Sequence, residues 1–449
     1  MVRTFLARSN SRTISPDKSR ASVSLLLLGA VQVTLIAAIT VITVALPAIA
    51  RDMRVTESGL VLVSAGYGIS FGGLLPLGGR LADRFGRRRV FAAGTALFGV
   101  ASAGAGLAPT AGSLMAARLA QGAGAALTAP AAVALLGVVF PDPDRHGRAL
   151  ATWGVLSSAG AIAGTVLSGV LIAWVSWRWA FAPPAAIAGI AAIATPRVLP
   201  AGPAPASTRI DWPGAVLATA GLAALIYGLE RAGWAVAAGA ALLALFVLAE
   251  RRAAAPLVPL PFLGRRVLPL AAVLTCAAVM ATAFFLLSLY LQQVRGLSAL
   301  RTSAVFLLPV PAAVTAGPLA GRLIGRFGAR PVLAAGLVGA AAGLLLLSFL
   351  SVPYAGLLLF PFGAGLAFSA ATVIAMYDAS AAQAALAGAL VSTAMETGPP
   401  LGLAVLTWAA TIYSHDPAAG YPFALRVASI MLLVLAVFTT THHSEERHR

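Results

Sequence analysis

The stretch PLGGRLADRFGRRRV at residues 76–90 occurs a second time, as PLAGRLIGRFGARPV at residues 318–332. Ten of the fifteen positions are identical, and a constant offset of 242 residues separates the two copies. Each copy connects the end of one long apolar segment to the start of the next. A connection repeated in this way predicts a membrane protein with two related halves, a plan found in many secondary transporters.

The composition is typical of a membrane protein. The chain has 449 residues, of which 59% are hydrophobic and only 10% are charged, and its mean hydropathy is +0.91. A soluble protein carries about 25% charged residues, and repeated runs of roughly 20 apolar residues indicate helices that cross a bilayer. The first run, of about 25 residues, exceeds the apolar core of a cleaved signal peptide and therefore predicts a retained membrane helix.

Fourteen apolar segments are long enough to be candidate spans. They cover about 22–47, 58–78, 90–108, 113–139, 148–173, 178–196, 213–230, 233–249, 267–291, 303–323, 331–350, 354–376, 386–413 and 421–441. The repeat offset exceeds the roughly 200 residues that six helices and their loops need, so two helices fit between the halves. The sequence predicts an all-α polytopic membrane protein with two six-helix halves plus two inserted helices, 14 transmembrane helices together.

The expected parts of the chain follow from these spans. They are a basic N-terminal tail at 1–21, an N-terminal six-helix bundle at 22–196, linkers with two inserted helices at 197–266, a C-terminal six-helix bundle at 267–441 and a second tail at 442–449.

The basic residues predict an orientation. With the N-terminus in the cytoplasm, 23 Lys and Arg residues fall on the inner side and seven on the outer side. The positive-inside rule then places both termini in the cytoplasm. Frequent Arg, Ala and Gly are typical of a GC-rich bacterial genome, so we expect a multi-pass protein of the bacterial inner (plasma) membrane. The net charge of +17 lies in short loops, which indicates membrane lipid and not nucleic acid as the partner.

The first copy of the repeat carries glycines and charges at fixed spacing. They are Gly79, Arg80, Asp83, Arg84, Gly86, Arg87 and Arg88. This pattern resembles the signature loop between helices two and three of the major facilitator superfamily. Glycines allow a sharp turn where two helices approach. Asp83 can face a helix N-terminus or an arginine of a neighbouring helix, forming a lock that breaks when the halves rock.

An alternative is that these arginines only fix the topology. In the second copy Gly325 stands where the first has its aspartate, so we expect the stronger lock in the N-terminal half.

Two further motifs resemble those of proton-coupled exporters of the same superfamily. Arg118 and Gln121 match its helix-four motif, where a buried arginine can bias a nearby proton site. The alternative is that Arg118 snorkels to the nearby membrane surface. Gly160, Gly164 and Gly169 match its helix-five motif, which lets helices pack closely and can seal the pathway between the halves. The family proline is Thr165 here and one glycine is Ser168, so generic small-residue packing explains the pattern equally well.

Three other stretches narrow the resemblance to the fourteen-helix drug:proton antiporters of the EmrB/QacA type. They are Ser176-Trp177-Arg178-Trp179 before helix six, Asp211-Trp212 with Gly214 before the first inserted helix, and residues 388–406 in the penultimate helix. With the span count, the resemblance covers essentially the whole chain.

The chain departs from that group at one acidic position. Where the first helix of the group has an aspartate, this sequence has Ala38, which puts proton coupling and cationic substrates in doubt. Glu396 is the one acid deep inside a predicted span, and we expect it to be a coupling residue. Pro399 and Pro400 are expected to break its helix and free backbone carbonyls. The alternative is a protonated or hydrogen-bonded glutamic acid that only packs between helices.

The resemblance implies export of a hydrophobic or amphipathic small molecule (a drug, antibiotic or metabolite) by alternating access, driven by proton entry. Alternatives are an uncoupled or uptake carrier of the same fold and a non-transporting membrane sensor or scaffold. The sequence shows no nucleotide-binding loop, metal-ligand cluster or nucleophile–base set, and it has a single cysteine, Cys276. We therefore expect no catalytic residues, no bound metal and no cofactor apart from the proton as coupling ion, in a monomer.

Overall fold

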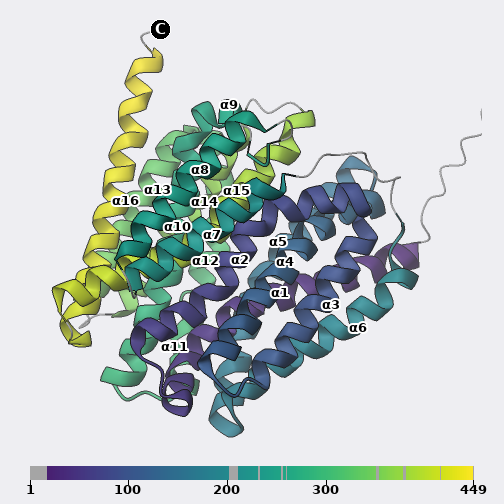
Figure 1. Ribbon diagram of the computed structural model, residues 1–449. Helices are drawn as coiled ribbons and strands as arrows, with labels where there is room; N and C mark the ends of the chain where they lie inside the picture. Colours follow the sequence, from purple (N-terminus) through teal and green to yellow (C-terminus); the bar gives the residue numbers. More distant parts are fainter. Residues whose placement is uncertain are drawn as a thin grey trace, which may run out of the picture.

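The structure is a computed structural model that describes residues 18–201, 211–230, 233–253, 256–258, 260–349, 353–377, 381–414 and 416–447. In this part of the chain every regular element is a helix (Figure 1). The α-helices are α1 (Lys18–Met53), α2 (Glu57–Phe85), α3 (Arg87–Gly106), α4 (Ala111–Val139), α5 (Pro143–Trp174), α6 (Ala182–Val198), α7 (Trp212–Glu230), α8 (Trp234–Arg252), α9 (Leu260–Leu263), α10 (Val267–Leu289), α11 (Ala299–Leu307), α12 (Val310–Phe327), α13 (Ala329–Ser348), α14 (Pro353–Met376), α15 (Ala381–Tyr413) and α16 (Pro417–Arg447). Short 3₁₀-helices at Trp177–Phe181 (η1) and Gly264–Arg266 and a π-helical turn at Tyr290–Val294 connect some of them.

The expected fourteen helices are present in the described residues. Of the α-helices named above, α9 is a single turn and is not counted. Helices α11 and α12 count as one helix, because they follow one another with an interruption at Pro309. Eleven of the fourteen are long and apolar enough to cross a membrane, which makes the chain a multi-pass membrane protein. The other three are α3, α5 and α15, and α5 contains a shorter apolar stretch at Ala159–Trp174.

Two helix ends differ from the expected tail boundaries. Helix α1 begins at Lys18, inside the tail expected at 1–21, and α16 continues to Arg447, inside the tail expected at 442–449. A helix continues beyond its apolar part because each further turn adds backbone hydrogen bonds whether or not its side chains are apolar.

Polar caps start several of the helices. Thr56 accepts the N–H of Gly59 at the start of α2, and Asp142 accepts the N–H of Arg145 at the start of α5. Helix α4 begins with a capping box between Thr110 and Ser113. Such side chains satisfy N–H groups of the first turn that have no partner within the helix.

The repeated loop forms the same sharp turn twice. Gly86 separates α2 from α3 with φ 93°, and Gly328 separates α12 from α13 with φ 85°. Both values lie in a region that favours glycine because other residues lose free energy there through contacts of their Cβ atom. We call the end of the bundle that holds these turns the Gly86 end, and the opposite end the Arg178 end.

The helices pack as neighbours in two groups (Figure 1). Among α1–α6, drawn in purple and blue, α2 and α3 pack on α4, and α1 packs on α5. Among α10–α16, drawn in green and yellow, α10 packs on α15 and α13 packs on α14 and α16. The teal helices α7 and α8 pack on each other, and α7 also contacts α2 and α15.

Candidate functional site

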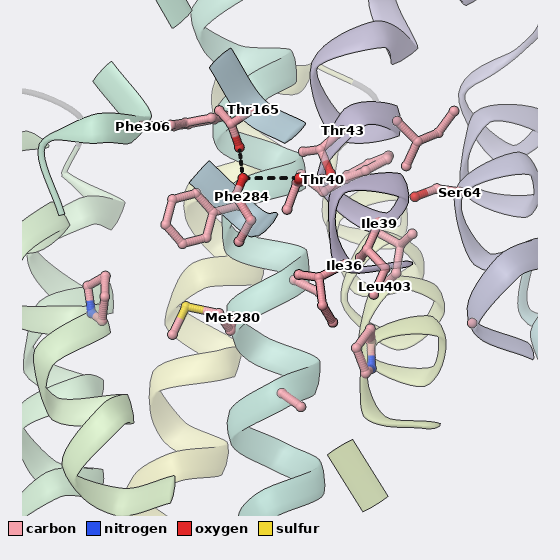
Figure 2. A pocket seen from close by; sticks show the side chains of 18 of the residues that line it. Ile36, Ile39, Thr40, Thr43, Ser64, Thr165, Met280, Phe284, Phe306 and Leu403 are labelled. Carbon is pink, nitrogen blue, oxygen red and sulfur yellow. Dashed lines mark hydrogen bonds between the residues drawn. The ribbon is translucent and has the colours of Figure 1, made fainter. Parts of the chain in front are cut away.

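A cavity of about 540 Å³ lies between the two groups of helices. Its lining comes from α1, α2, α4 and α5 on one side and from α10, α11, α12, α14 and α15 on the other. Most of the lining is apolar, and it includes Met280 and Phe284 of α10 and Ile36 and Ile39 of α1, which are labelled in Figure 2. A concave, mostly apolar site with a few polar groups suits a small organic molecule.

Arg118 is the cationic side chain of this lining. It extends from α4, is 1% exposed, and donates from Nη1 to the carbonyl of Ala38 and to Oε1 of Gln121, both at 3.1 Å. The Tyr67 ring of α2 lies 4.9 Å from the centre of its guanidinium. Gln121 in turn donates to Ser102 Oγ at 2.8 Å, which fixes its amide orientation. This burial does not fit a side chain that snorkels to the membrane surface.

Glu396 is the acidic side chain of the lining. It extends from α15 and is 7% exposed. In the described part of the chain its carboxyl has no hydrogen-bond partner, and it does not form an ion pair with Arg118. The cavity therefore holds one cationic and one acidic group that are not paired with each other.

The expected break in α15 is absent, and that prediction is wrong. Pro399 and Pro400 lie within a continuous helix from Ala381 to Tyr413. Proline lacks an N–H, so the carbonyls of Met395 and Glu396 lose their usual partners one turn later, as expected. Membrane helices tolerate this loss where neighbouring helices support the backbone. Here α2 does so, because a Cβ on Gly68 would lie 3.0 Å from Cδ of Pro400.

Hydroxyl groups of α1 and α5 meet at the edge of the cavity. Thr40 and Thr165 both donate to the carbonyl of Ala161, at 3.1 Å and 2.9 Å (Figure 2). Two residues of the helix-five motif allow this approach, because a Cβ on Gly160 would lie 2.6 Å from the Val33 carbonyl and one on Gly164 would lie 2.7 Å from the Ala37 carbonyl.

The N-terminal and C-terminal groups of helices touch on the side of the cavity toward the Arg178 end. Ser288 of α10 donates to the carbonyl of Thr43 at 3.0 Å, and Ser303 of α11 donates to the carbonyl of Thr165 at 3.0 Å. Gly169, the third residue of the helix-five motif, also faces Ser303. The motif therefore lies partly between α1 and α5 and partly between the two groups.

The arginines of the first repeat copy bind the ends of other segments. Arg87 donates to the carbonyl of Ala134 in α4, Arg88 to that of Leu199 after α6, and Arg80 to that of Pro256. Positive charge is favourable near the C-terminal end of a helix, and Ala134 lies in the last two turns of α4 while Leu199 directly follows α6. These contacts tie the α2–α3 turn to its surroundings.

Other residues of the signature loop are more exposed. Asp83 lies 3.6 Å from Arg87, the first residue of α3, and is about half exposed. Arg84 is exposed and lies over the ring of Phe85. Gly79 is half-buried, and a Cβ added to it would lie 3.9 Å from Cβ of Pro130 in α4.

The motif before α6 joins three helices at the Arg178 end. Arg178 pairs with Asp52 at the end of α1 and also donates to the carbonyl of Ala108 after α3. Trp177 donates from Nε1 to the same carboxylate at 3.1 Å. Asp211, from the resembled stretch before the first inserted helix, accepts the N–H of Gly214 and caps α7.

Within the described residues there is no group of three or more His, Cys, Asp or Glu side chains that could hold a metal ion. Several side chains of the site were not singled out from the sequence, Tyr67 and Met280 among them. Tyr67 was missed, although a tyrosine between two glycines in an apolar span is a usable signal. Met280 was missed because nothing distinguishes it from packing residues. The sequence also places Asp378 and His415 in loops between predicted spans, and both lie outside the described residues.

Comparison with known proteins adds three findings. A family model described as Major Facilitator Superfamily matches residues 28–403. The chain is 35% identical over 437 residues to the puromycin resistance protein pur8 of Streptomyces alboniger, covering 89% of this chain and 86% of that protein. It is 36% identical over 437 residues to the cephamycin export protein CmcT of Amycolatopsis lactamdurans, covering 89% and 88%.

Among solved structures, an auto-inhibited peptide transporter of the POT family superposes with a TM-score of 0.73. The match covers 95% of this chain and 97% of that chain at 16% sequence identity. At this identity the likeness concerns the fold.

Proposed function

Because the chain belongs to the Major Facilitator Superfamily, we propose that it exports hydrophobic or amphipathic small molecules in exchange for protons. The superfamily consists of transporters and not of enzymes. Relatives named for antibiotic resistance or export support the outward direction of transport. A drug, an antibiotic or a metabolite is the expected substrate.

The observation that carries this proposal is the cavity between the two groups of helices. Its volume of about 540 Å³ and its mostly apolar lining suit a small amphipathic molecule. The lining is drawn from both groups, so a relative rotation of the groups changes the shape of the cavity and the end to which it opens. Alternating access of this kind moves a molecule without a covalent step.

Glu396 is the proposed proton carrier. An unpaired carboxylate is costly in an apolar cavity, and the cost disappears when it takes up a proton or meets a cation. Arg118 and Gln121 are proposed to set the electrostatics of the proton site from the opposite group of helices. Ala38 leaves α1 without the acid found in related exporters, so Glu396 has to take that role alone.

The proposed architecture is that of the fourteen-helix EmrB/QacA-type group. Helices α1–α6 and α10–α16 form the two rocking halves, α7 and α8 are the inserted pair, and both termini lie in the cytoplasm. The separate packing of the two groups and the recurrence of the Gly86 turn at Gly328 support this layout. In it the Asp83 loop acts as a lock at the cytoplasmic side.

Transport by the purified protein tests the proposal. Liposomes that contain a pH-sensitive dye receive an imposed proton gradient and a panel of lipophilic drugs that includes puromycin and a cephamycin. We expect drug-dependent proton movement in the wild type and none with Glu396→Gln at equal protein content, because glutamine cannot carry a proton. Glu250→Gln is the matched control, since Glu250 is also buried but lies outside the cavity lining.

Full activity of Glu396→Gln across pH would refute the role of Glu396. Drug movement without proton movement in the wild type would favour the second candidate, an uncoupled carrier of the same fold. Ala38 is the observation that favours this candidate, because it removes an acid from the path that protons are expected to take.

A further inference from the structure

Among the described residues, the hydrogen-bond and ring partners of the buried Arg118 guanidinium are all neutral groups. Its partners in the described part of the chain are the carbonyl of Ala38, the amide oxygen of Gln121 and the ring of Tyr67. Its Nε is buried and has no hydrogen-bond partner there. A cation that is 1% exposed is costly unless an anion compensates it, and neutral acceptors supply only part of that compensation.

The described part of the chain pairs no anion with this guanidinium. Arg118 donates to the carbonyl of Ala38 in α1 at 3.1 Å, and the methyl side chain of Ala38 carries no charge. Glu396 lines the same cavity but does not form an ion pair with Arg118. An anionic molecule that enters the cavity would supply the compensating charge.

We propose that the cavity selects amphipathic anions, whose carboxylate or sulfonate group binds Arg118 while the apolar body lies against Met280, Phe284 and Phe306. This inference rests on the proposed function and names the substrate class of that same site. Guanidinium groups suit planar or tetrahedral oxyanions because several N–H donors point in fixed directions. Nε adds a donor that no described residue uses.

Substrate charge can be tested with three probes that share a naphthalene body. Anilinonaphthalene sulfonate is anionic, N-phenylnaphthylamine is neutral, and naphthylethylenediamine is cationic. Their fluorescence is titrated with the full chain in lipid nanodiscs, without a proton gradient, and empty nanodiscs give the background. The binding measured in this way does not depend on coupling or on the direction of transport.

The decisive variant is Ala38→Asp, which places a carboxylate beside Arg118 without removing any existing contact of the guanidinium. We expect it to weaken binding of the sulfonate by about tenfold or more, because charge-assisted hydrogen bonds to the ligand are replaced by internal ones. Ala38→Asn has nearly the same size without the charge and is expected to retain sulfonate binding. Binding of the neutral probe is expected to stay unchanged in both variants.

Arg118 itself gives a second test. Arg118→Gln is expected to lose sulfonate binding to the same degree, and Arg118→Lys to retain part of it, because lysine keeps the charge but not the geometry of the donors. Binding of the neutral probe shows whether each variant is folded. If Arg118→Gln no longer binds the neutral probe, the comparison of Ala38→Asp with Ala38→Asn still tests whether an anion binds at Arg118.

Several results would overturn the inference. These are equal effects of Ala38→Asp and Ala38→Asn on the sulfonate, a charge-independent loss with all three probes, or tightest binding of the cation. Glu396→Gln separates the two proposals, because we expect it to retain sulfonate binding while coupled transport is lost. Sulfonate binding by a protein that transports nothing would leave the inference standing and would contradict the proposed function. Export of neutral molecules without any preference for anions would support the proposed function and would contradict the inference.

Discussion

The two copies of the repeated loop have the same turn but different surroundings. In the first copy, Gly78 of α2 lies so close to α4 that a Cβ there would be 2.7 Å from the carbonyl carbon of Ala126. Glycines at 317, 321 and 325 around the second copy have no neighbour within 4 Å of an added Cβ. The same local sequence therefore fixes the local turn, while packing of the preceding helix depends on which residues face its neighbours.

The arginine at position 80 and its counterpart at position 322 differ in the same direction. Arg80, Arg87 and Arg88 of the first copy each donate to a backbone carbonyl of another segment. Arg322 of the second copy is exposed and has no hydrogen-bond partner in the described part of the chain. Basic residues that serve topology alone are expected to look like Arg322, so the first copy has an additional structural use for its charges.

The largest loss of folded protein is expected from a substitution at Gly78. Gly78→Ala puts a methyl group into the Ala126 backbone, so α2 and α4 have to separate, and we expect little folded protein. The equivalent position of the second copy already holds Ala320, which is fully buried, and Ala320→Gly is expected to cost about 1–2 kcal/mol through lower helix propensity and the lost methyl group. Size-exclusion profiles and thermal unfolding of the two variants in detergent measure the contrast. Equal yields and melting temperatures would show that the two copies pack alike.

An intermediate loss of stability, equal for the two positions, is expected from substitutions at the Gly86 and Gly328 turns. Gly86→Ala and Gly328→Ala both force a Cβ into a backbone conformation with positive φ, at a cost of about 1–2 kcal/mol each. Thermal unfolding of the single variants and of the double variant gives both values and their additivity. A much larger loss for Gly86→Ala would mean that the surroundings, and not the turn itself, determine the cost.

The smallest effect is expected from the loop arginines. Arg80→Gln removes a contact with the Pro256 carbonyl, which we expect to cost about 1 kcal/mol of unfolding free energy, and Arg322 is its counterpart in the second copy. Arg322→Gln removes an exposed side chain and is expected to change stability by less than about 0.5 kcal/mol. Chemical denaturation of both variants, with wild type in the same lipid, resolves the difference. The comparison fails if Arg322→Gln proves the more damaging substitution.

Much of the fold could be predicted from the sequence because long apolar runs have few alternatives in a bilayer. All fourteen expected segments are helical, and the Gly86 turn lies where the glycines of the loop place it. Gln121 follows Arg118 by three positions, so their contact on one helix face was also predictable.

The partners of Arg118 on other helices were not predictable in this way. Contact with the Ala38 carbonyl and with Tyr67 depends on how α1, α2 and α4 are rotated about their axes, and a single sequence does not specify this rotation. The expected break at Pro399 and Pro400 failed for a related reason. Local rules describe an isolated helix, whereas close contact with Gly68 and Gly72 of α2 supports the backbone of α15 at this point.

Helix α7 touches both α2 and α15, and these two helices belong to different groups. Its contacts are made largely by small or aliphatic side chains, with Thr219 against Gly73 of α2 and Ile226 beside Ala65 and Ala404. If the two groups of helices rotate against each other as proposed, α7 can stay fixed to only one of them and has to shift along the other. Small and aliphatic contact residues suit such a shift, because they do not interlock as long side chains do, and α7 then continues to cover the contact between α2 and α15, the helix that carries Glu396.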